Sequence, residues 1–226
     1  YEIVDLPGTY SLSVIGDNCA IDECIACNYL ITNPPDLVIN VVDASNLERQ
    51  LYLTAQLLEM QIPVVVALNM MDMAKRRGIH IDIAQLSRSL HCPIISLTAI
   101  HGFGIAELRR ALLVIPQTNS TLPYSFAPLL QGALQTLTEK LAPKNLPRPW
   151  LALRLLEEDR LARHYTSAEE LSHVTVLIQQ LKNQCGEEID LLIADARYRW
   201  IQSILKPSLV VNPQGKTFTS RLDRIV

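Results

Sequence analysis

The first 115 residues alternate short apolar runs with segments of helical periodicity. The apolar runs are rich in β-branched residues and nearly continuous, which is typical of parallel strands covered on both faces. The helical segments instead repeat apolar residues at spacings of three and four. The expected strands are residues 1–5, 37–42, 63–68 and 93–97, and the expected helices are residues 47–58, 83–90 and 105–113. This alternation predicts an α/β fold with a doubly wound parallel sheet. Ser45, with Glu48 three residues later, predicts a capping box at the first of these helices.

Residues 116–226 show helical periodicity and no runs typical of buried strands. The expected helices are residues 151–163, 167–183 and 189–205. Thr166 or Ser167 can cap the second of them, because Glu169 and Glu170 follow in its first turn. The second half therefore predicts a small all-α domain.

The proline distribution suggests where the two parts meet. Six of the 13 prolines lie between residues 116 and 149, as expected for a connector. We therefore expect two domains, at residues 1–118 and 119–226.

Composition and charge exclude several classes of protein. The chain has 226 residues, of which 49% are hydrophobic, and a net charge of −3. That apolar fraction excludes a disordered tail, no run of about 18 apolar residues predicts a membrane span, and a charge near neutral argues against a nucleic-acid partner. Five cysteines, an odd number, favour a reduced cytosolic chain over a secreted one.

The two halves of the chain differ in charge. The first 115 residues carry a net charge of −5 and the rest +2. The second half thus offers either a solvated charged face or a contact for anionic lipid or for the acidic first half.

Polar and small residues follow each of the expected strands. The segments are Asp5-Leu6-Pro7-Gly8, Asp43-Ala44-Ser45, Asn69-Met70-Met71-Asp72 and Thr98-Ala99-Ile100. Ligands bind at the carboxyl ends of the strands in open parallel sheets, so we expect these segments to gather at one edge. The first segment also matches D-x-x-G, and the third matches N-x-x-D.

The chemistry of these segments suits a guanine nucleotide. Asp5 can hold the water shell of a Mg²⁺ ion, and Gly8 lets its N–H approach a terminal phosphate without a Cβ in the way. Asp72 can accept hydrogen bonds from the two N–H groups on the guanine base edge, which adenine does not offer. Asn69 can tie neighbouring loops together, and the N–H of Ala99 can donate to the guanine carbonyl oxygen. Alone, D-x-x-G is commonly a turn and N-x-x-D a helix cap. Their order along one sheet edge predicts the nucleotide site.

Two other motifs are rejected as functional sites. Gly215-Lys216-Thr217 resembles the end of a phosphate-binding P-loop, but Val210 stands where its first glycine belongs and no buried strand leads into it. Cys19, Cys24 and Cys27 have the spacing of part of an iron–sulfur site, but the next cysteine lies far along the chain and the flanking residues predict an apolar helix. We expect these three to be small buried thiols. The five histidines show no paired metal-binding spacing.

Five segments carry a resemblance to a known family. They are residues 5–12, 39–49, 67–72, 193–198 and 222–226. The first three closely resemble the cytosolic part of the ferrous iron transport protein B family. The last two resemble its helical domain and its approach to the membrane, so the similarity extends over essentially the whole chain.

The resemblance implies a Ras-like P-loop GTPase fold that hydrolyses GTP to GDP, followed by a helical domain like a GDP-dissociation inhibitor. It further implies a place at the cytoplasmic face of the bacterial inner membrane, joined to a transmembrane domain that imports Fe²⁺. By matching positions, residues 5–8 would contact the γ-phosphate and Mg²⁺, residues 69–72 would select guanine, and residues 98–100 would form the last base-contacting loop. Gly8 and Thr9 are the candidates for a catalytic role.

Three departures from the family pattern limit what is carried over. The family's P-loop and Thr-bearing first switch precede the D-x-x-G motif, so we expect them before residue 1. The scarcity of glycine, with 8 in 226 residues, agrees with that expectation. Met70 stands where many GTPases have Lys, and Thr9 stands where Ras-like proteins have the Gln that orients the attacking water. We therefore expect slow hydrolysis.

Two alternatives to a GTPase that gates or drives transport stay open. One is a nucleotide-sensing module whose bound state, rather than its turnover, acts on the transport domain. The other is a helical half that serves chiefly as a docking platform. Neither the contact of Fe²⁺ with this segment nor assembly into a homo-oligomer is decided by the sequence.

Overall fold

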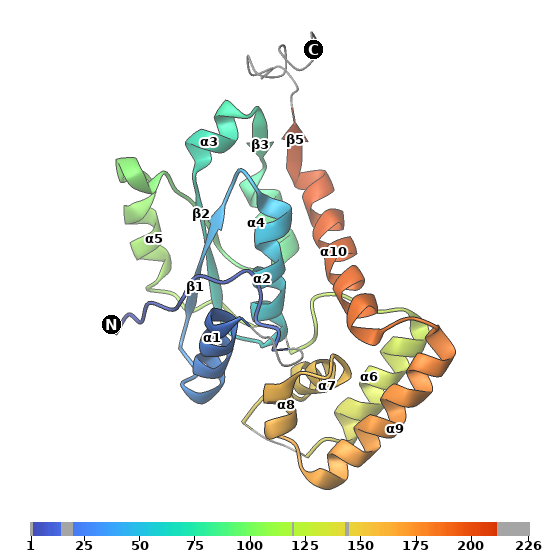
Figure 1. Cartoon of the computed structure of the whole chain (residues 1–226). Coiled ribbons are helices and arrows are strands. Elements are labelled where there is room, and N and C mark those ends of the chain that lie inside the picture. The colour runs from blue at the N-terminus through green and yellow to red at the C-terminus, as the bar shows by residue number, and fades with distance from the viewer. Residues whose placement is uncertain (1, 15–19, 119, 143–144, 212–226) are drawn as a thin grey trace. The chain divides into compact units, whose positions relative to one another are not determined.

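Three parallel strands form the sheet of the first half of the chain. They are β1 (Val38–Asp43), β2 (Val64–Asn69) and β4 (Ile94–Ser96), in the order β1-β2-β4 (Figure 1). The structure, a computed structural model, describes residues 2–14, 20–118, 120–142 and 145–211. The central strand β2 is buried from Val64 to Leu68, as its nearly continuous apolar run predicts. The parallel sheet predicted for residues 37–42, 63–68 and 93–97 is confirmed.

Helices lie on both sides of this sheet. In Figure 1, α4 (Ile83–Leu90) and α5 (Ile105–Ala111) lie on opposite sides of the strands, so the sheet is doubly wound as predicted. The remaining helices of the first half are α1 (Ile21–Thr32), α2 (Leu47–Glu59), α3 (Met71–Arg76) and the 3₁₀ helix η1 (Ala99–His101). The sequence did not predict α3 and η1, because six and three residues are too few to show a helical period.

The predicted strand at residues 1–5 does not form. Residues 2–9 adopt no regular secondary structure, and Ile3 and Val4 are 80% and 46% exposed. A strand is stable only where a neighbour completes its backbone hydrogen bonds, and none of the described strands pairs with this segment. Two apolar residues bury too little surface to hold the segment without such a partner. The D-x-x-G motif therefore does not follow a strand.

The predicted capping box at α2 is also wrong. The helix begins directly after Asn46, one residue beyond Ser45. The turn before it is closed by Asp43, whose Oδ1 accepts the Ser45 N–H at 2.8 Å. The Ser45 hydroxyl accepts a hydrogen bond from Arg77 Nη1 at 3.1 Å. The Asp43 carboxylate thus accepts the Ser45 N–H that the Glu48 side chain would accept in a capping box.

Among the described residues, five helices follow residue 127. They are α6 (Pro128–Lys140), α7 (Arg148–Leu156), α8 (Arg160–His164), α9 (Ala168–Cys185) and α10 (Ile189–Ser208). The helices predicted at residues 167–183 and 189–205 are confirmed. Helix α6 lies in the stretch that the prolines mark as a connector. Pro128 is its first residue, where the missing N–H costs no hydrogen bond.

The single helix predicted for residues 151–163 is broken into α7 and α8. Glu158 adopts a left-handed backbone with φ of 58°, and Asp159 then caps α8 by accepting the Ala162 N–H at 3.1 Å. By contrast, the capping box of Ser167 and Glu170 at α9 is confirmed. The apolar periodicity continues through the break, so sequence alone could not reveal it.

Strand β3 (Ile79–Ile81) pairs antiparallel with β5 (Leu209–Val211). The expectation that residues 116–226 contain no strand is therefore wrong. Each of these strands has only three residues, and pairing between segments so far apart in sequence leaves no local signal.

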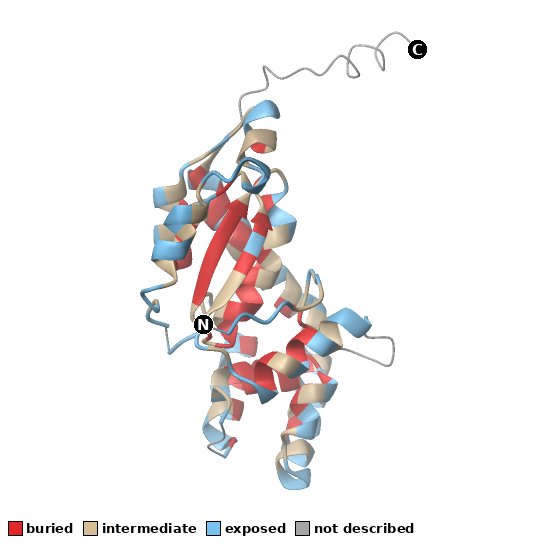
Figure 2. Ribbon diagram, turned by 90° about the vertical axis from the view of Figure 1, so that its left-hand side faces the viewer, coloured by how far each residue is buried: buried red, intermediate tan, exposed pale blue. Residues whose placement is uncertain are grey.

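The chain folds into two compact units. One, called here the helical unit, comprises Tyr1–Asp36, Tyr52–Pro63 and Gln117–Ile201. The other, called the sheet unit, comprises Leu37–Leu51, Val64–Pro116 and Gln202–Val226. In each unit, buried positions lie on the strands or on the inward faces of the helices (Figure 2). The predicted domain boundary at residues 118 and 119 stays a prediction.

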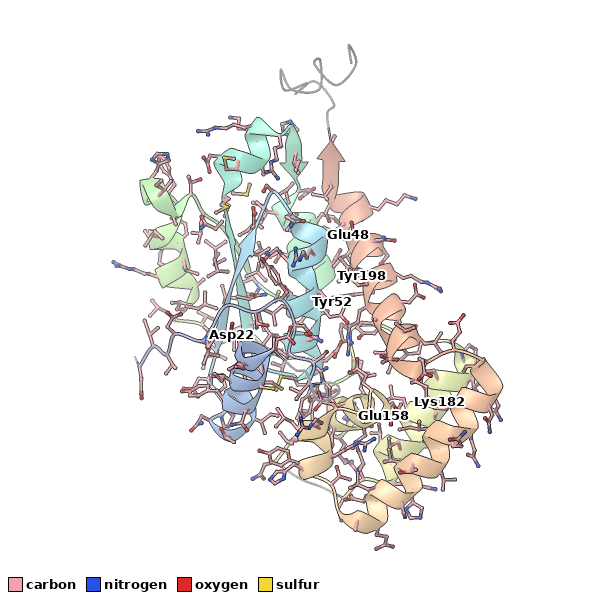
Figure 3. All side chains as sticks on the ribbon, viewed as in Figure 1. Asp22, Glu48, Tyr52, Glu158, Lys182 and Tyr198 are labelled. Carbon is pink, nitrogen blue, oxygen red and sulfur yellow. The ribbon has the colours of Figure 1, made fainter. Side chains whose placement is uncertain are left out.

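A buried arginine joins three helices of the helical unit. Arg197 of α10 is fully buried, and its Nε and Nη2 donate to the two carboxylate oxygens of Glu59 of α2 at 2.6 and 3.0 Å. Its Nη1 and Nη2 donate to Glu157, which follows α7, at 2.5 and 3.1 Å. Nη1 also donates to the Tyr52 hydroxyl at 3.2 Å. Tyr52 also contacts Tyr198, with ring centroids 5.1 Å apart, and both residues are labelled in Figure 3. All five guanidinium N–H groups are thus used.

A second buried arginine extends the cluster. Arg154 of α7 donates from Nη1 to Glu157 at 3.2 Å and to the Ser13 hydroxyl at 3.0 Å. Its Nε and Nη2, like the indole N–H of Trp150, are buried without a hydrogen-bond partner in the described part of the chain. Arg154 lies 5.9 Å from the centroid of the Trp150 ring, and this cation–π contact offsets part of that cost.

Substitution of Arg197 should destabilise the helical unit severely. Arg197→Met removes the guanidinium but keeps an apolar chain of similar length, which leaves Glu59 and Glu157 buried without this cation. We expect the free energy of unfolding to fall by about 3–5 kcal/mol, measured by urea denaturation. Arg199→Met is the matched control, because Arg199 lies on the same helix but is 78% exposed in its ion pair with Asp195. Equal stabilities of the two variants would contradict this account.

The contribution of Glu157 should depend on pH. Burial by itself raises the pKa of Glu157, but attraction to Arg197 and Arg154 and their hydrogen bonds outweigh it, so its pKa lies below the ordinary 4.5. A carboxylate with a lowered folded pKa contributes stability above its unfolded pKa and loses it as pH falls through the folded value. Glu157→Gln should therefore be less stable than the parent at pH 7, with the difference shrinking below about pH 4.5. Urea denaturation across this range measures the difference, and a constant difference would refute the assignment.

Candidate functional site

The carboxyl ends of the three parallel strands are joined by backbone hydrogen bonds within the sheet unit. The N–H of Ala44, after β1, donates to the carbonyl of Asn69, the last residue of β2, at 2.9 Å. The N–H of Met71 donates to the carbonyl of Leu97, after β4, at 3.2 Å. Parallel strands place successive loops at one edge, and these bonds fix the loops against one another.

A side-chain hydrogen bond links two of the predicted motifs directly. Asn69 Oδ1 accepts the backbone N–H of Ala99 at 3.0 Å. This is the tie between neighbouring loops that the sequence predicts for Asn69. The Ala99 N–H, which we expected to reach a guanine carbonyl oxygen, is directed at Asn69 in this structure.

Asp72 lies in the first turn of α3 and is partly exposed. The preceding Met70 has a left-handed backbone with φ of 59° and a side chain that is largely open to solvent. Asp72 Oδ2 lies 3.7 Å from Arg76 Nη2, one turn along the helix. This contact was not foreseen from the sequence, although the spacing of four residues is the usual signal for such a pair.

The loop after β4 depends on a glycine that the sequence analysis missed. Thr98 and Phe103 form an antiparallel bridge, and Gly104 has φ of 83°. A Cβ on Gly104 would lie 2.1 Å from the carbonyl oxygen of Ser96 and 2.7 Å from Leu97 Cδ2. Only glycine therefore allows the loop to close against β4. Ile100, at its tip, is 85% exposed.

The D-x-x-G motif lies in the helical unit, in the extended segment that begins the chain. Asp5 and Gly8 are exposed, and a Cβ on Gly8 would meet no atom within 4 Å. The Thr9 hydroxyl donates to the carbonyl of Ser11 at 2.6 Å and accepts the Ser11 N–H at 3.2 Å. The structure thus brings together residues 69–72 and 98–100 in the sheet unit, whereas residues 5–8 belong to the helical unit.

The residues after this motif are anchored within the helical unit. The Leu12 N–H donates to Gln56 Oε1 at 2.7 Å, and the Val14 N–H donates to Asp159 Oδ2 at 3.0 Å. Ser13 accepts from Gln56 Nε2 at 2.8 Å. Burial raises the pKa of Asp159, and the attraction of Arg154 and the two backbone N–H groups only partly opposes that rise.

The described residues contain no group of three or more His, Cys, Asp or Glu side chains that could hold a metal ion. Mg²⁺ does not need one, since it keeps most of its water and binds one or two carboxylates plus phosphate oxygens. The exposed carboxylate of Asp5 fits a contact through water of that kind.

The cysteine prediction is partly wrong. Cys27 is a buried free thiol, whose pKa burial raises to about 12, but Cys24 is disulfide-bonded. Cys24 is also only partly buried, so it is not the buried free thiol that the sequence predicted. Cys19, the Gly215-Lys216-Thr217 motif and residues 222–226 lie outside the described residues.

Comparison with known proteins bears on the whole chain. A family model described as ferrous iron transport protein B matches residues 1–112, and one described as the FeoB cytosolic helical domain matches residues 126–210. The structure of the cytosolic domain of Legionella pneumophila FeoB is 38% identical and superposes with a TM-score of 0.78, covering 91% of this chain and 79% of that one. The chain belongs to the ferrous iron transport protein B family.

Two further family members show the extent of the match. The Fe(2+) transporter FeoB of Escherichia coli K12 is 43% identical over 229 residues, which cover 99% of this chain and 29% of the relative. The chain thus spans under a third of the length of this relative. The S. thermophilus NFeoB bound to GDP, AlF₄⁻ and K⁺ is 30% identical with a TM-score of 0.77, covering 88% of this chain and 79% of that one.

The likeness to FeoB cytosolic domains confirms the predicted fold, a parallel doubly wound sheet followed by helices. Of the described residues, no helix is both long and apolar enough to cross a lipid bilayer. The roles predicted for individual site residues stay predictions at this point.

Loss of the Asn69 side chain should loosen the loop that starts at Ala99. Asn69→Ala removes the acceptor of the Ala99 N–H, and the loss of one hydrogen bond of about 0.5–1.5 kcal/mol corresponds to roughly 2- to 13-fold faster local opening. Amide hydrogen exchange at Ala99 measures this. Asn69→Asp retains an acceptor oxygen and should exchange like the parent, and equal exchange in all three proteins would contradict the role of the bond.

Proposed function

We propose that this chain is the GTP-binding and slowly GTP-hydrolysing cytosolic part of a bacterial ferrous iron transporter. The observation that carries the proposal is the hydrogen bond from the Ala99 N–H to Asn69 Oδ1, which unites the two predicted base-reading loops at one sheet edge. A family member with GDP, AlF₄⁻ and K⁺ bound supports the choice of ligand.

The base end of the site recognises guanine through Asp72. Its two carboxylate oxygens accept hydrogen bonds from the two N–H groups of the guanine edge, and its first-turn position on α3 holds them at the end of β2. The segments Asn69-Met70-Met71-Asp72 and Thr98-Ala99-Ile100 enclose the purine. Met70 offers a thioether where a Lys is common in GTPases, so contact with the base there is apolar rather than ionic.

The phosphate end of the site consists of Asp5-Leu6-Pro7-Gly8. With nucleotide bound, Gly8 would donate its N–H to the γ-phosphate and Asp5 would hold Mg²⁺ through a water molecule. The ion would supply positive charge that neutralises the phosphate. In this fold most phosphate affinity comes from the P-loop backbone and its Lys, which the resemblance places upstream of these residues. The ratio of the affinities for GTP and xanthosine triphosphate, which differ only in the base, is therefore more informative than either affinity alone.

Hydrolysis is slow because Thr9 replaces the Gln that orients the attacking water. The Thr9 hydroxyl donates to the Ser11 carbonyl and accepts the Ser11 N–H. Because these bonds keep the hydroxyl from orienting a water molecule, they favour nucleotide sensing as the second candidate function. A variant of the complete transporter that binds GTP without hydrolysing it separates the two. Full iron uptake by that variant supports sensing, and loss of uptake supports coupled hydrolysis.

The place of the chain in the cell follows from its family. The E. coli relative is an Fe(2+) transporter, so we assign this segment to the cytoplasmic face of the inner membrane, attached to a transmembrane Fe²⁺ domain. Residues 1–118 form the GTP-binding domain and residues 119–226 the helical domain, which slows release of GDP. Nucleic acid is no partner, and a homo-oligomer is compatible with this arrangement.

Substitution of Asp72 should change base preference rather than abolish binding. Asp72→Asn loses the acceptor for one guanine N–H and gains a donor that matches the extra carbonyl of xanthine. We expect GTP to bind about 10- to 150-fold more weakly, as for loss of a charge-assisted hydrogen bond, and xanthosine triphosphate to bind more tightly, both by titration calorimetry.

Asp82→Asn is the matched control for this experiment. Asp82 lies in the same unit and caps α4, and Asn caps helices equally well, so GTP preference should not change. The proposal would be contradicted if the parent chain did not bind GTP more tightly than ATP. It would also be contradicted if Asp72→Asn left the ratio of the affinities for GTP and xanthosine triphosphate unchanged.

A further inference from the structure

The sheet unit carries a cluster of exposed cations on α3 and at the end of α10. We call this cluster the basic edge; it consists of Lys75, Arg76, Arg77 and Lys206, all exposed. Lys75 and Arg76 form the last turn of α3, Arg77 follows directly, and Lys206 lies in the last turn of α10 before β5. Figure 1 shows α3, β3 and β5 side by side.

The cations of the basic edge are only partly neutralised. Arg76 has Asp72 at 3.7 Å, and Arg77 donates to the hydroxyl and carbonyl of Ser45. No ion pair joins Lys75 or Arg77 to a carboxylate within the described part of the chain. The nearby Asp82, which follows β3, is held at the start of α4, where it accepts the Gln85 N–H. The basic edge therefore keeps a net positive charge.

The chain leaves its described part beside the basic edge. Val211, the last residue of β5, pairs with Ile79, two residues after Arg77. Val210 pairs with His80 across the same ribbon and is 61% exposed, so an aliphatic side chain lies open next to the cations. Basic side chains with an exposed aliphatic neighbour are the combination that binds the headgroup region of an anionic bilayer.

We propose that the basic edge binds the anionic phospholipid headgroups of the membrane surface. Two observations select this partner. The first is that the four side chains of the basic edge are exposed and positively charged. The E. coli relative, of which this chain matches only 29%, is a transporter, so a membrane surface is present wherever such a chain works. The inference rests on family membership and not on nucleotide binding, so it can fail or hold independently of the proposed function.

The energetics allow a sharp test. A basic residue near an anionic leaflet contributes about 1 kcal/mol, or about fivefold in partition. Neutralising Lys75 and Arg76 together should therefore lower the partition onto anionic vesicles about 25-fold. The attraction should also weaken with salt, because the Debye length falls from about 10 Å at 0.1 M to about 3 Å at 1 M.

The experiment is co-sedimentation of the 226-residue chain with vesicles of phosphatidylcholine alone or mixed equally with phosphatidylglycerol. We expect binding to the mixed vesicles only, weakened about 25-fold in Lys75→Gln/Arg76→Gln and lost at high salt. Arg109→Gln/Arg110→Gln is the matched control. These two arginines also end a short helix of the sheet unit, one of them in an ion pair with Glu107, but α5 lies across the sheet from β3 and β5.

Several outcomes would overturn the inference. Equal binding to neutral vesicles would mean that the charge is irrelevant, and equal losses in the two double variants would mean a nonspecific response to net charge. Displacement from the mixed vesicles by millimolar inorganic phosphate at constant ionic strength would indicate a site for free phosphate instead. Circular dichroism of both variants checks that each is folded, which these exposed positions should allow.

Discussion

The helical unit depends on satisfying one buried guanidinium completely. Arg197 has no access to water, so each of its five N–H groups needs a partner inside the protein. Glu59 takes two of them in a bidentate pair, and Glu157 and Tyr52 take the rest. These bonds can form together only if α2, the end of α7 and α10 are placed and rotated so that their side chains meet at the guanidinium. Because breaking a buried pair costs far more than forming it gains, the cluster specifies this arrangement against alternatives more than it adds stability.

The same requirement explains why the chain breaks after α7. Glu157 must turn its carboxylate toward both Arg197 and Arg154, while Asp159 must accept the Val14 N–H and cap α8. A continuous helix would separate two such side chains by about 200° around its axis. The left-handed conformation of Glu158 lets the chain turn between them. The free-energy cost of that backbone conformation is offset by the hydrogen bonds of the Glu157 and Asp159 carboxylates.

The sequence predicted what local patterns determine and missed what distant partners determine. The strands β1, β2 and β4 were visible as β-branched runs, although only β2 is buried along nearly all of its length. The tie made by Asn69 was predicted because parallel strands end at one edge. The segment containing Ile3 and Val4 failed as a strand because strand formation depends on a neighbour, which no local pattern reveals. Gly104 was missed for a similar reason, because a side chain is excluded there only by the nearby carbonyl oxygen of Ser96. The partners of Arg197 were not predicted, because Glu59 and Glu157 lie far from it in the sequence.

The contact between Asp72 and Arg76 bears on the base-reading role proposed for Asp72. Its contact with Arg76 is long, at 3.7 Å, and mostly exposed, so it stabilises the chain by at most about 1 kcal/mol. Two short hydrogen bonds from a guanine edge, each to a charged acceptor, contribute more than that. In the role proposed for Asp72, this weak ion pair therefore holds the carboxylate at the start of α3 without strongly opposing a hydrogen-bonded base. The same spacing of four residues that makes the pair possible also keeps the Arg76 guanidinium one helical turn away from the base-reading loops.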